Sequence, residues 1–562
     1  MRRSNRVLIA LCYIMLTALT AGCGMNAGTP AAGAATKDAA PAPKETPVPE
    51  KAMDPVPVDA PEEAADVADE QEPEEEEEEK PHIRLTVDDP GWDVFVPATG
   101  DHPDYRYGPA LIRNDDGSID AWFSAPGDGS REYDFITYKH SDDGGVTWGE
   151  ERVVLRATSG APDALSACDP DVFYYDGWYY LGYTSTINKK EKGLCNSAYL
   201  ARSKQPEGPY EKWNGHGFGG AAVPIVYYDG VDIGWGAGEV SFVVKDDTLF
   251  VYSTKDSYSA DPRRYRKTEV RTVSLKEENW PGKLTLRGYG LDRSDTVESE
   301  IDPDAEDPYI YKDADSWDVA YVEEADKFLA LGCNRRFKID SSLVYFESDD
   351  GICFRRVGEL NNNVICKCHN CGLMTDEQGH IKPGDPILIA YAYSGAYRSA
   401  WGIWGTRMAP ATLSLTEEFD RSEDGTENLK EALQCRPGVG NAAPVRCDAN
   451  EAFDPGAEGD GPAGELVDFY PMTEKIEIPM GQPWIIKVRP MAIIRGQRLH
   501  ELSGPELMKY GITFRCEDES ICHAREDGNL FPKAEGETTV LVRSENGRQM
   551  TIAVRILPKM CN

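Results

Sequence analysis

The sequence predicts an all-β protein: a five-bladed β-propeller followed by a small β-sandwich. One hairpin-like segment recurs along the chain at a spacing of roughly 55 to 75 residues, which is longer than a usual propeller blade because loops are inserted. Each copy is followed by further strand-like residues, so each unit holds about four strands, enough for one blade. Near the C-terminus, short strands alternate with turns, which is typical of a β-sandwich.

The clearest copy of the repeated hairpin runs from Asp169 to Thr186. Its turn is Asp176-Gly177, and an Asp-Gly pair between aromatic and β-branched residues is a strong hairpin signal. Asp169 and Asp171 begin its first strand, and strand alternation is expected to place both carboxylates on one face. The other copies begin near Gly108, Glu239, Trp317 and His369.

The N-terminus has the pattern of a targeting segment. Arginines precede an apolar run, Val7–Leu19, which is too short for a membrane-spanning helix and has the flanks of a signal peptide. The run ends in Leu19-Thr20-Ala21-Gly22-Cys23, which resembles a bacterial lipobox except that Thr20 stands where an aliphatic residue is usual. The resemblance implies that residues 1–23 are a lipoprotein signal peptide and that Cys23 carries the lipid. The protein would then be extracellular and anchored to the cell membrane. Ordinary secretion with cleavage elsewhere is the alternative.

Residues 24–81 are rich in Ala, Pro and Glu and hold few residues that could build a core, which predicts a disordered acidic tether. The whole chain has a formal net charge of −38. This charge argues against nucleic acid and against anionic membrane surfaces as partners. We therefore expect contact with the membrane only through the N-terminal lipid.

The chain has 14 cysteines, of which Cys12 lies in the predicted signal peptide and Cys23 is the candidate lipidation site. The remainder is even, which in an exported chain predicts disulfides, with Cys516 and Cys522 as a candidate local pair. The cluster around Cys366 and Cys371 lacks a second ligand pair at zinc-like spacing, so it is a weak metal candidate.

Two turns near strand ends share a short pattern. Residues 141–148 fit S-x-D-x-G-x-T-W, the Asp-box pattern, and residues 348–354 are a shortened relative. Asp and Gly build a tight turn in such a pattern and the aromatic residue packs between strands. We interpret the motif as structural and assign Asp143 no catalytic role.

Changes in composition divide the chain after the tether. We expect the propeller over residues 82–417, a polar, Gly- and Pro-rich linker over 418–468 and the β-sandwich over 469–558. The residues around 518–538 resemble the bacterial immunoglobulin-like domain of the group 2 type. That resemblance implies a spacer or adhesion module at the C-terminus.

The first residues of the innermost strands of a propeller line one central funnel. From the repeats, that ring is expected to hold Gly108, Asp169, Asp171, Glu239, Asp318 and His369. Glycoside hydrolysis needs two carboxyl groups, one to protonate the leaving oxygen and one to activate water or attack the sugar. Trp178 and Trp235 offer aromatic faces for sugar rings, so we predict both as substrate-binding residues.

The segment Pro170–Leu181 resembles the A-P-D-V hairpin of the five-bladed propeller glycosidases of glycoside hydrolase family 43 and its clan. The resemblance implies that Asp171 orients the general acid and tunes its pKa. Gly238-Glu239-Val240 resembles the segment that carries the general acid, which implies that Glu239 is the acid. The family's base Asp is expected where this chain has Gly108. The candidate substitutes are Asp104, Asp169 and Asp318.

His369 resembles the central His that supports a calcium ion or a water in some members of that family. The resemblance implies no required cofactor, and it allows a structural calcium ion in the centre of the propeller. It also implies that His369 lies at the substrate site and that the substrate is a polysaccharide or oligosaccharide.

Three functions are compatible with these patterns. The first is a surface glycoside hydrolase. The second is a sialidase-like enzyme, suggested by the Asp-box and by Arg106 in Tyr105–Pro109, with Arg335 or Arg398 as further arginines that would bind substrate. The third is a non-catalytic glycan-binding protein, supported by Gly108 at the position of the base.

Overall fold

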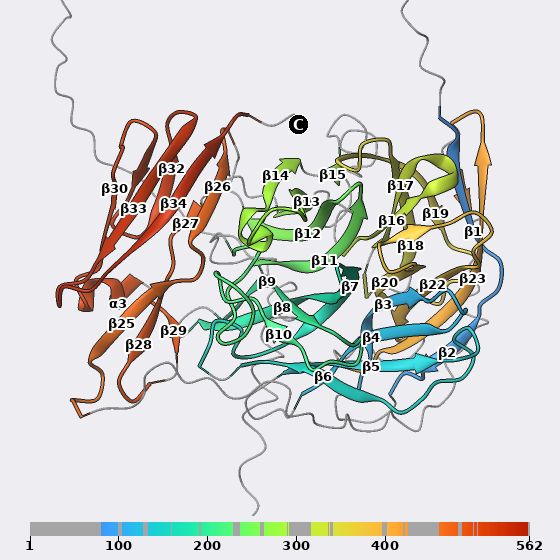
Figure 1. Ribbon diagram of the computed structural model, residues 1–562, viewed down its shortest axis with the longest axis horizontal. Helices are drawn as coiled ribbons and strands as arrows, with labels where there is room; N and C mark the ends of the chain where they lie inside the picture. The colour runs from blue at the N-terminus through green and yellow to red at the C-terminus, as the bar shows by residue number, and fades with distance from the viewer. Residues whose placement is uncertain are drawn as a thin grey trace, which may run out of the picture. The chain divides into compact units, whose positions relative to one another are not determined.

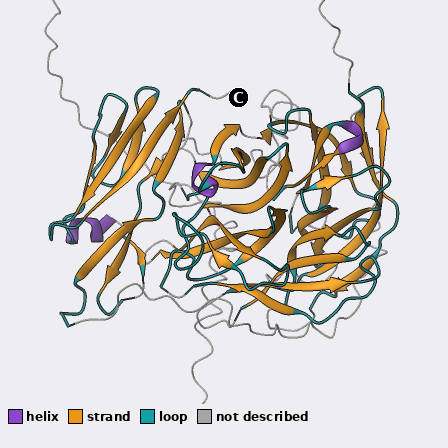
Figure 2. Ribbon diagram, in the orientation of Figure 1, coloured by secondary structure: helices purple, strands orange, loops and turns teal. Residues whose placement is uncertain are grey.

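A computed structural model describes residues 80–98, 104–127, 133–158, 160–189, 193–228, 236–258, 264–288, 290–291, 316–334, 336–337, 341–395, 402–419, 422–424, 460–481, 486–497, 499–502 and 504–559. These residues form strands almost throughout, and their helical segments are short (Figure 2). The predicted all-β class is therefore confirmed. The predicted signal peptide with Cys23, nearly all of the predicted tether and most of the predicted linker lie outside the described residues.

Five antiparallel units follow one another along the chain (Figure 1). The first unit contains β3 (Tyr107–Arg113), β4 (Ile119–Pro126), β5 (Asp134–Ser141) and β6 (Arg152–Arg156), and the second contains β7 (Cys168–Tyr175), β8 (Trp178–Lys189), β9 (Gly193–Ser203) and β10 (Glu211–Lys212). The third contains β11 (Gly236–Lys245), β12 (Thr248–Tyr258), β13 (Arg264–Ser274) and β14 (Thr285–Gly288), and the fourth contains β16 (Asp318–Val322), β17 (Lys327–Asn334), β18 (Ser342–Ser348) and β19 (Cys353–Leu360). The fifth contains β20 (Cys368–Thr375), β22 (Ile387–Tyr393), β23 (Gly405–Thr416) and β1 (His82–Val87).

Smaller elements are attached to these units. The additional strands are β2 (Trp92–Phe95), β15 (Gly290–Leu291), β21 (His380–Ile381) and β24 (Ser422–Asp424). The short 3₁₀ segments are η1 (Trp280–Lys283) and η2 (Glu323–Ala325).

The first strands of the five units, β3, β7, β11, β16 and β20, contact one another in order, and β20 contacts β3 again. This last contact includes a parallel pairing of Met374 with Leu111. A closed ring of first strands, each followed by an antiparallel unit, is the arrangement that a five-bladed propeller requires.

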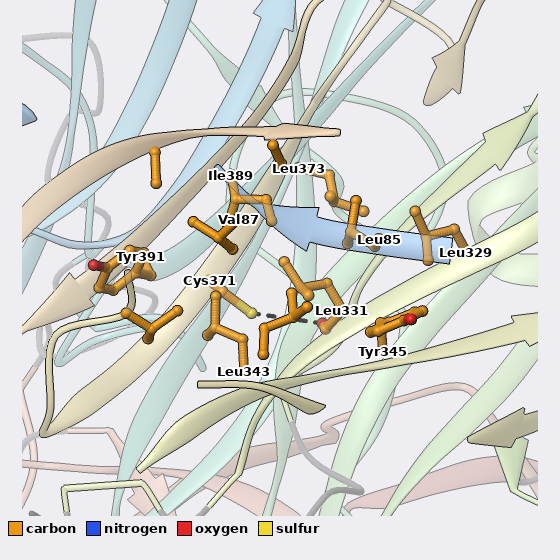
Figure 3. Packing of buried hydrophobic residues seen from close by; sticks show 14 of the residues in the cluster. Leu85, Val87, Leu329, Leu331, Leu343, Tyr345, Cys371, Leu373, Ile389 and Tyr391 are labelled. Carbon is orange, nitrogen blue, oxygen red and sulfur yellow. Dashed lines mark hydrogen bonds between the residues drawn. The ribbon is translucent and has the colours of Figure 1, made fainter. Parts of the chain in front are cut away.

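The fifth unit is completed by β1, which comes from the start of the described chain. β1 pairs antiparallel with β23, with His82 opposite Thr416. Its inward side chains Leu85 and Val87 are buried in one cluster with residues of the fourth and fifth units, as Figure 3 shows. The N-terminal strand therefore joins the last unit of the ring through both backbone pairing and apolar burial.

The predicted hairpin at Asp176-Gly177 is confirmed: both residues have positive φ, 47° and 77°, and Tyr175 pairs with Trp178 across the turn. Positive φ at both central residues is the geometry of a type I′ turn, which suits the twist of the flanking strands.

The beginnings of β3, β7 and β11 share a β-bulge, seen as a register shift in their pairing with the next strand. At the bulge, Gly108, Asp169 and Glu239 all have positive φ, 59°, 48° and 50°. A bulge re-aims side chains and is common next to active sites. It also breaks the simple alternation that was expected to pair Asp169 with Asp171 on one face.

The C-terminal strands form three small sheets that share one hydrophobic core. The elements are β25 (Leu466–Pro471), β26 (Lys475–Pro479), β27 (Ile486–Lys487), β28 (Pro490–Ile494), β29 (His500–Glu501), α3 (Gly504–Lys509), β30 (Thr513–Cys516), β31 (Cys522–Ala524), β32 (Asn529–Pro532), β33 (Gly536–Arg543) and β34 (Gln549–Leu557). The predicted disulfide between Cys516 and Cys522 is not formed; both are free, buried thiols in hydrogen-bonding contact.

Within the described part of the chain, no helix has the length and apolar character needed to cross a membrane.

Candidate active site

Asp169 lies at the bulge that begins β7, and its side chain is almost completely buried, at 9% exposure. Its backbone N–H donates to Ser124 Oγ at 2.7 Å, which fixes the left-handed backbone. Burial and the neighbouring carboxylate of Glu239 raise the pKa of Asp169 to about 7. A carboxyl group in this state carries a proton up to neutral pH, as a general acid must.

Glu239 occupies the equivalent position at the beginning of β11 and is also 9% exposed. Its backbone N–H donates to Thr184 Oγ1 at 2.7 Å. Its Oε1 accepts a hydrogen bond from Arg336 Nη2 at 2.9 Å, whereas the buried Oε2 has no hydrogen-bond partner among the described residues. Thr184 is also hydrogen-bonded to the Asp169 carboxyl, so one hydroxyl contacts both acidic residues.

The anchoring of the positive-φ residues at or before the start of the inner strands repeats from unit to unit. Ser124 on β4 accepts the N–H of Asp169, Thr184 on β8 accepts that of Glu239, and Thr254 on β12 accepts that of Ser316 at 2.6 Å. Each hydroxyl belongs to the second strand of the preceding unit. A bulge leaves a backbone donor outside the strand ladder, and a buried donor requires a partner. The repeat therefore fixes the backbone of both acidic residues in the same way.

Arg336 connects the carboxylate pair to His369. Its Nη1 donates to Ser316 Oγ at 2.7 Å, and its Nη2 donates to His369 Nδ1 at 2.8 Å as well as to Glu239. Since a guanidinium only donates, Nδ1 must be the unprotonated ring nitrogen. Burial and the Arg336 charge lower the pKa of His369 well below its usual value, so the ring is neutral.

These residues do not fit a calcium ion at His369. The Nδ1 atom of His369 already faces a guanidinium, and a second cation beside it would be repelled. In the described part of the chain, no cluster of three or more His, Cys, Asp or Glu residues is arranged to hold a metal.

Asp171 and Asp318 form a second carboxyl pair. Asp171 Oδ2 accepts the N–H of Phe242 at 2.6 Å, and Asp318 accepts Ser241 Oγ at 2.9 Å and the N–H of Leu373 at 2.5 Å. Burial and the proximity of Asp318 raise the pKa of Asp171, and burial raises that of Asp318 to about 6. Their partners lie on adjacent inner strands, so this pair holds the ring together.

The acidic residues therefore pair differently in the structure from what the sequence suggested. Glu239 was expected to face Asp171, but its carboxylate neighbour is Asp169, while Asp171 faces Asp318. The bulge at Asp169 is the reason, because it re-aims that side chain relative to the rest of β7.

Gly108 stands at the bulge position of the first unit, where the sequence resemblance expects a base. A Cβ atom at Gly108 would lie 3.3 Å from the Cα atom and 3.5 Å from the Oδ1 atom of Asp169. A carboxylate side chain at position 108 would therefore crowd that of Asp169, in addition to requiring a positive φ.

Two predicted substrate-binding residues are placed elsewhere. Arg106 is completely buried, and its Nε and Nη2 bind Glu151 at 2.6 and 2.8 Å, so its charge is used inside the protein. Trp178 lies at the turn end of its hairpin, opposite to the end that carries Asp169, with the guanidinium of Arg202 4.0 Å from its ring centroid.

The remaining aromatic and arginine candidates, Trp235, Arg335 and Arg398, lie outside the described residues. Asp143 binds the backbone N–H groups of Val146 and Thr147 within its own turn, in keeping with a structural role.

The site contains residues that sequence analysis missed. Arg336 and Phe337 follow the second strand of the fourth unit, and Trp404 precedes β23. Trp404 and Phe337 contact His369 with ring centroids 4.4 and 4.8 Å apart. Alignment of the hairpin copies on one another would have revealed a Ser or Thr at one shared position of their second strands, including Thr184.

Comparison with known proteins gives matches at the level of structure only. No family model and no curated protein matches the sequence. The catalytic domain of a glycoside hydrolase family 62 α-L-arabinofuranosidase from Coprinopsis cinerea superposes with a TM-score of 0.36 and 11% identity, covering 59% of this chain and 97% of that one.

Two further matches have similar values. A family 117 glycoside hydrolase from Zobellia galactanivorans has a TM-score of 0.39 and 14% identity, with 59% and 90% of the two chains covered. A family 43 subfamily 1 enzyme from Xanthomonas citri, complexed with xylotriose, has a TM-score of 0.39 and 12% identity, with 59% and 94% covered. Similarities of this size carry no argument about function. The function proposed below is argued from the residues of the site.

Proposed function

We propose that the protein is a glycoside hydrolase that cleaves polysaccharides or oligosaccharides at the Asp169–Glu239 pair. The observation that carries the proposal is the contrast between the two side chains. Asp169 has a pKa raised to about 7, whereas Glu239 is paired with the positive charge of Arg336. Two neighbouring carboxyl groups in such different environments can take the acid role and the base role separately.

The proposed hydrolysis begins with transfer of the Asp169 proton. Asp169 donates its proton to the glycosidic oxygen as the bond to the leaving sugar breaks. Glu239, paired with Arg336, either removes a proton from a water that attacks the anomeric carbon or attacks that carbon itself. In the second case the glycosyl ester on Glu239 is then hydrolysed by a water whose proton passes to Asp169. The sequence resemblance gave the acid role to Glu239; the surroundings of the two residues favour Asp169.

Substitution of each carboxyl group tests the roles. Asp169→Asn and Glu239→Gln are each expected to lower kcat about 10²- to 10⁴-fold on oligosaccharides. Only the variant that lacks the acid should retain most activity on glycosides with an activated aryl leaving group, because such a group departs without a proton. Xylo- and arabino-oligosaccharides form the first substrate panel, and Asp385→Asn, which alters a surface pair with Arg113, is the matched control.

The outcomes separate the candidate roles. Full activity of Asp169→Asn on oligosaccharides would contradict the proposal. If Asp169→Asn and Glu239→Gln exchange their expected behaviour, Glu239 is the acid and the resemblance gave the correct role.

A non-catalytic glycan-binding protein is the second candidate, and Gly108 at the position of the base is the observation that favours it. A wild-type protein that binds glycans by calorimetry but hydrolyses none of the panel would establish this function. The sialidase-like alternative loses its first candidate residue, since Arg106 is buried against Glu151.

We also propose the cellular setting of this activity. Residues 1–23 would be removed with lipidation of Cys23, so that residues 24–81 tether the propeller, 82–417, to the outside of the membrane, with the immunoglobulin-like module, 469–558, after the linker. Mass spectrometry of the mature N-terminus tests the anchor; an unmodified N-terminus downstream of Cys23 would exclude it.

A further inference from the structure

Phe337 is an exposed aromatic residue in a backbone conformation that bulky residues rarely adopt. Its side chain is 39% exposed and its φ is 66°. Its N–H donates to the carbonyl of Cys368 at 2.9 Å, which holds this backbone in place. Strained residues of this kind are concentrated at sites that bind ligands.

Phe337 is the solvent-facing end of an aromatic wall, defined here as Tyr107, His369, Trp404 and Phe337. The ring of His369 lies 4.7, 4.4 and 4.8 Å from those of Tyr107, Trp404 and Phe337. The first three members are buried, with exposures of 5%, 7% and 3% for Tyr107, His369 and Trp404. Only Phe337 in this wall presents its ring to solvent.

The wall runs from the carboxylate pair outward. Tyr107 directly precedes Gly108, whose Cβ position would lie 3.3 Å from the Cα atom of Asp169, and His369 and Glu239 share the same guanidinium nitrogen of Arg336. Asp169 and Glu239 are almost completely buried, whereas Phe337 is exposed, so the wall connects the carboxylate pair to solvent. With the anomeric carbon at the carboxylates, the next sugar ring on the solvent side would find its aromatic surface at Phe337.

We propose that Phe337 is a stacking platform for the sugar on the leaving-group side of the cleaved bond. The inference rests on the proposed function of the Asp169–Glu239 site and names the part of the substrate that this site recognises. The ligand is a neutral pyranose or furanose ring, whose face of C–H groups packs on an aromatic ring as other apolar surfaces do. The exposed ring makes this platform specific for chains of at least two sugars.

Two substrates separate this role from catalysis. Xylotriose or arabinotriose places a sugar on the leaving-group side, whereas the corresponding glycosyl fluoride has no leaving-group ring. Phe337→Asn removes the ring, and Asn tolerates positive φ, so the fold is retained. We expect KM for the trisaccharide to rise about tenfold, equivalent to about 1.4 kcal/mol. Because the guanidinium of Arg336 lies 5.4 Å from the Phe337 ring centroid, we expect some loss on the fluoride, but a clearly smaller one than on the trisaccharide, and near wild-type behaviour of Phe337→Tyr.

Phe419→Asn is the matched control. Phe419 is 37% exposed, and the guanidinium of Arg355 lies 4.0 Å from its ring centroid, but it packs on His82 and not on the aromatic wall. If Phe337→Asn and Phe419→Asn behave alike on the trisaccharide, the platform is overturned while the hydrolase function stands. Equal losses on trisaccharide and fluoride would also overturn it, since Phe337 would not act on the leaving-group side.

If the protein does not hydrolyse the trisaccharide, its binding can still be measured by calorimetry. If the wild type binds the trisaccharide but does not cleave it, the hydrolase function fails. A tenfold weaker Kd for Phe337→Asn would then still support the platform, and an unchanged Kd would refute it. Absence of both binding and cleavage across the xylo- and arabino-oligosaccharides overturns both proposals.

Discussion

The hydroxyl of Thr184 offers the sharpest test of how the fold controls the acidic pair. It accepts the backbone N–H of Glu239 at 2.7 Å and is hydrogen-bonded to the carboxyl of Asp169. Thr184→Val keeps the shape of the side chain and removes both interactions. The substitution should therefore disturb stability and the titration of Asp169 together.

The two effects have separate magnitudes. A buried N–H left without an acceptor costs about 1–3 kcal/mol of stability, since Thr184 is fully buried. The hydrogen bond from Thr184 lowers the pKa of Asp169 from the value that burial alone would set. Its loss should therefore raise that pKa above the present value of about 7.

The assay is the pH dependence of kcat/KM on an oligosaccharide, together with urea unfolding. If Asp169 is the acid, the basic limb of the profile should move to higher pH in Thr184→Val. Thr158→Val is the control, because Thr158 is also buried and its hydroxyl accepts Lys212 Nζ at 2.7 Å away from the carboxylate pair. It should lose similar stability without moving the limb. A destabilised Thr184→Val variant with an unmoved limb would refute the assignment of the acid to Asp169.

Three further predictions follow from buried groups. Asp169 and Asp318 have pKa values raised to about 7 and about 6, so the stability they contribute at low pH is lost as pH rises from about 4 to 7. Calorimetric Tm should therefore fall across this range, and Asp318→Asn should flatten the fall; an equally steep fall in the variant would contradict this. Gly108→Asp should destabilise the protein by more than about 1 kcal/mol, because of its positive φ, and raise the pKa of Asp169 by like charge; increased activity would contradict the steric argument. Mild oxidation should join Cys516 and Cys522, whose thiols are in contact, and thiol titration that still detects both would disprove it.

The repeated hairpins could be predicted because their signals are local. Asp176-Gly177 needs only its own neighbours in sequence to form a turn, and the structure has that turn. The all-β class and the order of the inner strands follow from such local signals added along the chain.

The closing strand could not be predicted in this way. His82–Val87 alternates as a strand should, but its partner β23 lies at the other end of the ring. Only closure of the whole ring brings the two together, so no local pattern names the partner.

The prediction of how the acidic residues pair was wrong for a different physical reason. Alternation holds for a regular strand, whereas β7 begins with a bulge at Asp169. Arg336 was equally hidden, because its contacts with Glu239 and His369 join three units that are distant in sequence. Sequence analysis therefore placed these acidic residues on the inner strands but did not predict which residues they contact.

The charges of the site also explain why a glycine can stand at position 108. The pKa of Asp169 is raised to about 7, and the guanidinium of Arg336 is paired with the carboxyl of Glu239. A third carboxylate at position 108 would add a buried negative charge beside Asp169, while Arg336 is already paired with Glu239, and a buried uncompensated charge is costly. Gly108 and Asp169 therefore belong together: the side chain that is absent at position 108 leaves room for the Asp169 carboxyl, which lies 3.5 Å from where a Cβ atom would be.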